Sequence, residues 1–354
     1  MITQSKAIAD PHINPQMPSQ SLYIWLLGVA AMVFIMVIVG AITRLTDSGL
    51  SMVEWRPIMG ALPPMTEAEW QRVYSLYQQS PEFIKKNSWM ALDDFKAIFF
   101  WEWFHRLLGR FIGLAYAVPL FIFWVKGLIP SAMRFKLLGL LILGGAQGFM
   151  GWYMVKSGLV DVPAVSHFRL AAHLGLALII YACLISLALD IRSQRRQNTQ
   201  QAQAHPYASQ KALLCHGWGA ITCFVATLIW GAFTAGMDAG LVYNTHFPML
   251  AEGQWLPDSY DILHEHSAIQ FTHRWLAILT MLMILSWVLH AYLKGAAFPA
   301  LYALGGAIIV QAGLGVGTLL SGVHLHVAVT HQAGALVCLF LIIIAIRHLR
   351  PCSP

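Results

Sequence analysis

A carboxylate and a histidine stand three residues apart where a long apolar run begins, in the segment 101–106 (WEWFHR). Residues at this spacing lie on one face of a helix, so Glu102 and His105 are expected to project together. A second apolar run opens with the segment 269–275 (IQFTHRW), which keeps the histidine and the arginine but has Gln270 at the acidic position. The sequence therefore predicts two matched sites, only one of which is acidic.

Four histidines occupy matched places near the starts of apolar runs. Polar side chains at membrane depth are costly and usually mark function. Paired imidazoles on facing helices of a four-helix bundle suit the axial positions of haem iron, whereas zinc is disfavoured because cysteine is absent here. Each histidine alone could be an interfacial residue bonded to a neighbour, but four matched positions favour ligation. The histidines fall two in each half of the chain: His105 and His173, then His273 and His331.

Charged residues beside these histidines suggest further roles. An acid next to an iron ligand can act as a general base or stabilise a developing positive charge. The alternative for Glu102 is an interfacial carboxylate in contact with water. The exchange to Gln270 favours function, because a segment needed only for packing would have no reason to differ in charge. Four arginines near the same face are candidate contacts for haem propionates, or ordinary interfacial arginines: Arg106, Arg110, Arg169 and Arg274.

The composition is that of an integral membrane protein. Of the 354 residues, 58% are hydrophobic and only 11% are charged, whereas soluble proteins carry about 25% charged residues. Roughly twenty apolar residues cross a bilayer. Eight such spans are predicted, at about 22–42, 97–125, 135–155, 168–189, 212–234, 268–293, 299–320 and 327–346. The basic residues behind the pI of 9.1 are therefore used to predict the orientation of the chain in the membrane. No nucleic-acid partner is expected.

Lysine and arginine set the expected orientation. With both termini in the cytoplasm, the short loops rich in these residues are cytoplasmic too, as the positive-inside rule requires. The first outer loop is also basic, but a long loop counts less in this rule. Spans two, four, six and eight then run from outside to inside, which predicts all four histidines at one depth near the outer face.

The chain repeats itself. The segment 40–50 matches 231–241, and Gln147 with Gly151 matches Gln311 with Gly315 at one constant offset. Each half holds four spans, an even number, so the halves enter the membrane in the same direction, related by a pseudo-twofold axis along its normal.

We therefore predict an all-α membrane protein made of two four-helix bundles. The expected parts are a cytoplasmic tail (1–21), an N-terminal bundle (22–190) with a long outer loop (43–96), a cytoplasmic linker (191–211) and a C-terminal bundle (212–354).

These motifs together resemble the haem A synthase family over nearly the whole chain. The most specific segments are 40–51 (GAITRLTDSGLS), the EWFHR of 102–106 with the following Gly109-Arg110, and the four-histidine layout. The resemblance implies that a ring methyl group of haem O is oxidised, through an alcohol, to the formyl group of haem A for terminal oxidase assembly. It also implies a haem b cofactor on His273 and His331, a haem O substrate site flanked by His105 and His173, and Glu102 as the required acid.

One departure from the family pattern narrows the expectation. The outer loop from Asp47 to Lys96 contains no cysteine, unlike some bacterial members. The chain therefore resembles the cysteine-free branch shared by proteobacteria and mitochondria, and its lack of a transit peptide points to a bacterial plasma (inner) membrane. The expected partners are the lipid bilayer, a haem O synthase and an electron-transfer protein; the oligomeric state, a homo-oligomer included, stays open.

Two other functions fit the same layout. A di-haem b electron carrier linked to quinone would hold two permanent haems and would tolerate glutamine at both acidic positions. A haem transporter would need an open path and would leave the haem chemically unchanged. The Glu102/Gln270 difference and the family motifs disfavour the first alternative.

Overall fold

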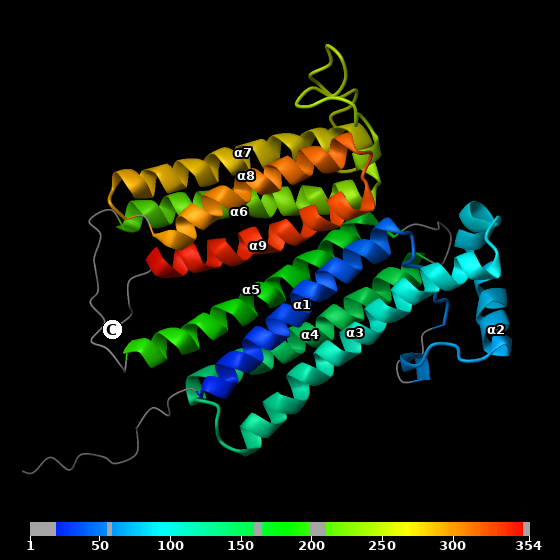
Figure 1. The fold of residues 1–354 in the computed structure, drawn as a ribbon, viewed down its shortest axis with the longest axis horizontal. Helices are drawn as coiled ribbons and strands as arrows, with labels where there is room; N and C mark the ends of the chain where they lie inside the picture. The colour runs from blue at the N-terminus through cyan, green and yellow to red at the C-terminus, as the bar shows by residue number, and fades with distance from the viewer. Residues whose placement is uncertain (1–18, 55–58, 159–164, 198–209, 297, 350–354) are drawn as a thin grey trace, which may run out of the picture.

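The computed structural model describes residues 19–54, 59–158, 165–197, 210–296 and 298–349 (Figure 1). Within these ranges the regular elements are all helices: α1 Gln20–Leu45, η1 Met59–Ala61, α2 Glu67–Gln78, η2 Phe83–Asn87, α3 Leu92–Val125, α4 Ser131–Gly158, α5 His167–Gln197, α6 Gln210–Gly236, η3 Ala239–Leu241, α7 His266–Leu293, α8 Pro299–Leu320 and α9 Leu325–Leu349. Eight of the described helices, α1 and α3 to α9, are long and apolar enough to cross a membrane, which confirms the predicted spans. Most of the predicted tail and linker lies outside the described residues.

Local sequence signals set where several helices begin. The Ser19 side chain accepts a hydrogen bond from the Leu22 amide at 3.2 Å and caps α1. Asp94, in the first turn of α3, accepts from the Ala91 amide at 2.9 Å, and its charge also suits the positive end of the helix dipole. Pro299 starts α8, at a position where its missing N–H costs no helical hydrogen bond.

The membrane helices form two groups with the same internal arrangement. In the first group, α1 and α4 each pack against both α3 and α5, so α3 and α5 face each other diagonally across the bundle. In the second group, α6 and α8 each pack against both α7 and α9, which places α7 and α9 on a diagonal too. Each group has its own buried apolar core.

The two bundles pack against each other along α1, α5, α6 and α9 (Figure 1). Leu336 of α9 is fully buried in the core of the first bundle, so the apolar packing is continuous across the interface. Arg44, in the last turn of α1, bonds Asp47 at 3.0 Å and Asp238, just after α6, at 2.8 Å. One guanidinium group thus joins the corresponding helix ends of both bundles.

The long connections lie at one end of the molecule (Figure 1). The segment between α1 and α3, which carries α2, and the segment between α6 and α7 both extend beyond the right end of the bundles, while α1 begins and α9 ends at the left. This placement is the one expected for two long outer loops. Which end faces the cytoplasm stays a prediction from the basic residues.

The first of these loops is folded, which the sequence analysis did not predict. Helix α2 packs through Trp70 and Tyr77 on Phe95 and Phe99 at the start of α3, and the Tyr77 and Phe95 rings stack with centroids 5.0 Å apart. Because of this support, α3 begins five residues before the predicted start of its span, at Leu92. His105 consequently lies more than three turns into its helix, whereas the other three histidines lie within about two turns of theirs.

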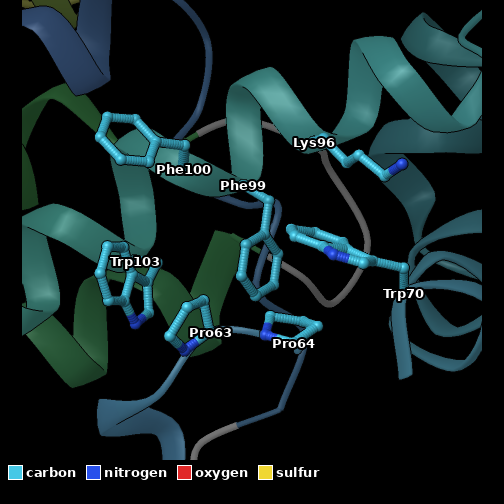
Figure 2. A pocket seen from close by; sticks show the side chains of 7 residues that line it. All are labelled: Pro63, Pro64, Trp70, Lys96, Phe99, Phe100 and Trp103. Carbon is cyan, nitrogen blue, oxygen red and sulfur yellow. The ribbon is translucent and has the colours of Figure 1, made fainter. Parts of the chain in front are cut away.

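The loop also encloses a cavity of about 310 Å³ against α3 (Figure 2). Pro63 and Pro64 form one wall, and rings from α2 and α3 form the other. Trp103 lines this cavity and donates to the Ala61 carbonyl at 3.2 Å. His105, two residues further along α3, projects from nearly the opposite side of the helix, so the cavity is separate from the histidine site.

Gly217 of α6 allows the closest contact in the C-terminal core. A Cβ atom there would lie 2.5 Å from Cζ2 of Trp287, a side chain with no exposed surface. Gly217→Ala is therefore expected to destabilise the protein by about 1–3 kcal/mol through overpacking, lowering the thermal midpoint in detergent. Gly306→Ala, with nothing within 4 Å of its Cβ, is the matched control and should leave the midpoint unchanged. Equal midpoints for both variants would contradict this packing.

Candidate haem-binding site

The four predicted histidines lie on the two diagonal helix pairs. His105 is on α3 and His173 on α5; His273 is on α7 and His331 on α9. His105 lies within electrostatic range of His173, and His273 within range of His331. The structure thus brings together one pair of imidazoles in each bundle, as the sequence predicted.

Each imidazole packs against a glycine of a neighbouring helix. A Cβ atom at any of these glycines would lie only 2.9 to 3.1 Å from the histidine Cε1 atom, so the helices approach this closely because the glycines have no side chain. The four contacts are Gly40 with His105, Gly151 with His173, Gly231 with His273 and Gly315 with His331.

The burial of the rings indicates which nitrogen is available. All four Nδ1 atoms are buried, although each side chain as a whole is only half-buried. Because Nδ1 is buried and Cε1 lies against the glycine, we expect the exposed part of each ring at Cδ2 and Nε2. The Nε2 atom of His173 lies 3.3 Å from Nε2 of Gln147 on α4. Neutral imidazole nitrogens are common metal ligands, so one accessible pair on a bundle diagonal fits the axial positions of a haem.

A site for a bare metal ion fits less well. Within the described residues, no group of three or more histidine, cysteine, aspartate or glutamate side chains is arranged to hold one. Cys183, Cys215, Cys223 and Cys338 are free thiols.

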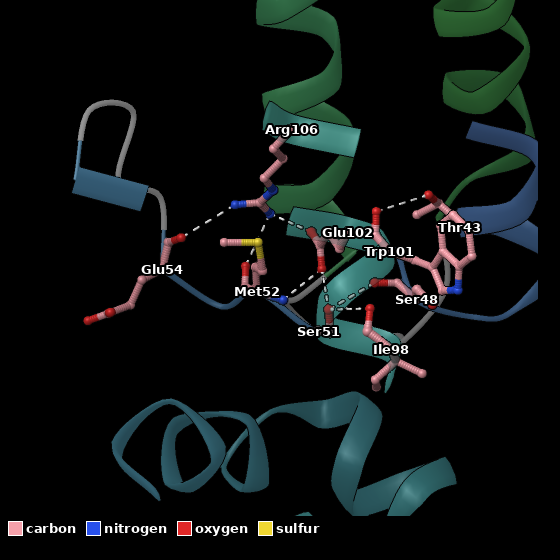
Figure 3. Close-up of polar contacts among 9 residues, drawn as sticks. All are labelled: Thr43, Ser48, Ser51, Met52, Glu54, Ile98, Trp101, Glu102 and Arg106. Atoms are coloured by element: carbon pink, nitrogen blue, oxygen red, sulfur yellow. Dashed lines mark hydrogen bonds and ion pairs between the residues drawn. The ribbon is translucent and has the colours of Figure 1, made fainter. Parts of the chain in front are cut away.

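Glu102 is buried and holds the first outer loop (Figure 3). Its Oε2 atom accepts hydrogen bonds from the Ser51 hydroxyl and the Met52 amide, both at 2.7 Å. Its Oε1 atom accepts from Arg106, one turn along α3, at 2.5 Å. Arg106 also donates to the carbonyl groups of Met52 at 3.1 Å and Glu54 at 3.4 Å. The carboxylate and the guanidinium group together form a latch between α3 and residues 51–54.

Gln270 and Arg274 form the corresponding latch in the second bundle. The Gln270 amide donates to the Val242 carbonyl and accepts from Arg274 at 2.9 Å. Arg274 is 5% exposed. It donates to the carbonyl groups of four residues of the second outer loop: Tyr243, His246, Pro248 and Met249.

The two latches give the acid–amide difference a second physical explanation. In the first loop the groups that face Glu102 are donors, an O–H and an N–H, and the carboxylate accepts both. In the second loop the facing group is a carbonyl, which needs a donor, and only the amide of Gln270 supplies one. The difference in charge between Glu102 and Gln270 is therefore also explained by loop anchoring, so it supports a chemical role of Glu102 less strongly than the sequence suggested.

The four candidate arginines divide into two kinds. Arg106 and Arg274 place donors on loop carbonyl groups, as described above. Arg169 lies over the Tyr153 ring, with 4.9 Å between its guanidinium carbon and the ring centroid, and is half-buried. Arg110 lies one turn further along α3 than Arg106 and is half-buried as well. All four arginines stay candidates for binding an anionic ligand group, and Arg106 and Arg274 also hold the outer loops.

Sequence reasoning missed several contacts. It identified Gly40, Gly151 and their repeats but did not predict that they contact the histidines. The repeat, in which both the glycines and the histidines recur, indicated that relation. Sequence reasoning did not predict the pair of His216 and His290, whose two Nδ1 atoms lie 3.2 Å apart. It placed residues 51–54 in a loop, as the structure does, but it did not predict their hydrogen bonds to Glu102 and Arg106, since nothing local identifies the acceptor of a loop N–H.

Comparison with known proteins places the whole chain in one family. The family of cytochrome oxidase assembly proteins named COX15-CtaA matches residues 23–343. A heme A synthase of Rhodospirillum centenum is 43% identical over 355 residues, covering 97% of this chain and 92% of the relative. The heme A synthase of Parvibaculum lavamentivorans is 45% identical, covering 88% and 90%, and that of Maricaulis maris is 41% identical, covering 92% and 95%.

The latches predict that exchanging acid and amide loosens each loop. Glu102→Gln directs an N–H₂ group at existing donors, and Gln270→Glu directs a carboxylate at the Val242 carbonyl. Leaving a buried polar group unsatisfied costs about 1–3 kcal/mol, so amide hydrogen exchange in the facing loop should accelerate about ten-fold or more.

The control for both variants is Glu67→Gln, an exposed acid of α2. It should leave exchange in residues 51–54 and 242–249 unchanged. Unaltered exchange in Glu102→Gln and Gln270→Glu would mean that the latches do not hold the loops.

Proposed function

The chain belongs to the COX15-CtaA family of cytochrome oxidase assembly proteins, and we propose that it is a haem A synthase. In this function it oxidises a ring methyl group of haem O in successive steps to the formyl group of haem A, which terminal oxidases require. The observation that carries the proposal is the similarity over nearly the full chain to proteins of that name. The paired histidines on bundle diagonals give this similarity a physical basis.

We assign His273 and His331 to a haem b cofactor, and His105 and His173 to the substrate site. The accessible Nε2 edges and the glycine contacts support iron ligation in both bundles. Bound haem b supplies an electron-transfer centre. The substrate is assigned to the first bundle because Glu102 is an acid, whereas the matching position of the second bundle holds Gln270.

The reaction needs water and an electron acceptor. In the first oxidation, water supplies the oxygen of an alcohol, and two electrons and two protons leave the substrate. A second oxidation of the same kind gives a geminal diol, which loses water to leave the formyl group. The electrons pass to an electron-transfer protein, which acts as the oxidant.

Glu102 is the proposed group in this bundle that responds to the positive charge developing on the substrate. Its carboxylate can stabilise positive charge on the reacting carbon or take a proton from the attacking water. The Ser51 hydroxyl can rotate away from Oε2, which frees one lone pair of that oxygen while the Met52 amide and Arg106 keep the carboxylate in place.

Arg110 and Arg169 are the proposed contacts for the propionates, because charge-assisted pairs between arginine and carboxylate are strong. Arg106 and Arg274, which also bond the outer loops, are the other two candidates. The matched glycine–histidine contacts and latches also support a pseudo-twofold relation between the bundles.

The proposed location is a bacterial inner membrane, with cytoplasmic termini and haem sites near the outer face. A haem O synthase is the proposed donor of substrate.

The decisive experiment is mass analysis of haems extracted from cells with and without the protein. A haem A synthase converts haem O to haem A only when the protein is present. A di-haem carrier or a haem transporter leaves haem O unchanged, and that result would overturn the proposal.

Two variants separate chemistry at Glu102 from loop anchoring. Glu102→Gln removes the acid, whereas Ser51→Ala removes one loop hydrogen bond and keeps the acid. We expect Glu102→Gln to retain both haems and to form haem A at least about 100-fold more slowly, because an acid–base group contributes about 10²–10⁴ in rate. Ser51→Ala should retain most activity. Equal losses in both variants would assign Glu102 to anchoring alone.

The glycine contact at His331 predicts a specific loss of haem b. Gly315→Ala places a Cβ atom 2.9 Å from Cε1 of His331, so the ring must shift. We expect the purified variant to retain about ten-fold less haem b, measured by visible absorption, because metal-site distortions of this kind typically cost 10–100-fold in affinity. Gly306→Ala on the same helix is the control. Full haem b content in Gly315→Ala would contradict the assigned ligand.

A further inference from the structure

A second buried acid lies in the first outer loop, outside the site described so far. Glu82 precedes η2 and is 4% exposed. The Tyr77 hydroxyl donates to its Oε2 atom at 3.2 Å, and Asn87 in turn donates to the Tyr77 hydroxyl at 2.7 Å. The carboxyl group is therefore held in a fixed position by a fully buried tyrosine.

This acid is close to the latch of Glu102. Tyr77 packs in one cluster with Phe95 and Ile98 of α3, and Met52 of the latch packs against the same cluster. Ile98 lies one turn before Glu102, and its carbonyl accepts from the Ser51 hydroxyl at 3.5 Å (Figure 3). Glu82 and Glu102 are near enough for their charges to interact. A folded part of the loop therefore joins the two acids.

The surroundings of Glu82 favour its neutral form. Burial raises the pKa of its carboxyl group to about 7, and the nearby charges of Glu102 and Asp47 act in the same direction. The Tyr77 hydroxyl bond and the charge of Lys86 on η2 act against the shift. Because the pKa is raised, Glu82 carries a proton below about pH 7 and is free to accept one above it.

The proposed reaction creates a need for such a group. Each oxidation releases two protons in a buried bundle, while three donors already engage the Glu102 carboxylate. The exposed residues Ile84, Lys85 and Lys86 begin two positions after Glu82. Glu82 is thus a buried acid within charge range of Glu102 and two residues from exposed chain.

We propose that Glu82 is the proton-relay residue of the N-terminal site, receiving protons released near Glu102 and passing them to the outer aqueous face. The inference rests on the proposed function. In this step a water or carboxylic O–H bond near Glu102 breaks and an O–H bond forms on Glu82, which then loses its proton to outside water. Glu82 acts through Glu102 and does not touch the substrate, so it is a positioning residue.

The test is the pH profile of haem A formation from haem O in membranes holding the full-length protein. In the wild type, the rate should rise with pH through about 7, where Glu82 becomes ionised and able to accept a proton. Glu82→Gln should lose this rise and slow the reaction by at least about ten-fold at high pH. Glu82→Asp should restore part of the rise. Glu67→Gln, an exposed acid of the same loop, should behave as wild type.

Infrared spectroscopy gives a readout that does not need turnover. The C=O band of a protonated carboxylic acid should disappear as the pH passes about 7 in the wild type, and this change should be missing in Glu82→Gln. A wild type that forms no haem A overturns the function and the relay together. A wild type that forms haem A, with Glu82→Gln keeping its rate and pH profile, overturns the relay alone. Loss of haem binding in both Glu82→Gln and Glu82→Asp would assign Glu82 a structural role and overturn the relay too.

Discussion

The contact between an imidazole edge and a glycine backbone determines much of this structure. It occurs four times, and each time it fixes the distance between a histidine helix and its neighbour. Cε1 faces the glycine and Nδ1 is buried, which leaves Nε2 as the nitrogen available to a ligand. In each bundle the two histidine helices lie on a diagonal, with their imidazoles within electrostatic range of each other. The repeat in the sequence thus corresponds to a contact that recurs in space.

The first outer loop belongs to the site as much as the helices do. Its residues 51–54 accept and donate hydrogen bonds at the latch, and its helix α2 supports the start of α3. The loop also buries Glu82 and Tyr77. A long connection between membrane helices would ordinarily be solvated and mobile. Here its aromatic side chains give it a core of its own, which explains how it can hold charged groups at fixed positions near the histidines.

The sequence predicted the parts of this protein that depend on one-dimensional patterns. Apolar runs of sufficient length predicted the eight spans, and the positions of His105, His173, His273 and His331 within those runs predicted their pairing. It did not predict α2, whose polar surface has no membrane signal. It also missed the bond between Glu102 and Met52, and the pair of His216 with His290, because the choice of a hydrogen-bond partner depends on which segments tertiary packing brings together.

The two latches also differ in net charge. Glu102 and Arg106 compensate each other, whereas the buried guanidinium group of Arg274 is surrounded by carbonyl and amide oxygens and, among the residues that the structure describes, bonds no carboxylate. Arg274 directly follows His273 in the chain. A positive charge in a medium of low polarity stabilises an added electron nearby. An iron centre held by His273 would therefore lie beside a positive charge that its latch does not neutralise, whereas the latch beside His105 pairs its own charges.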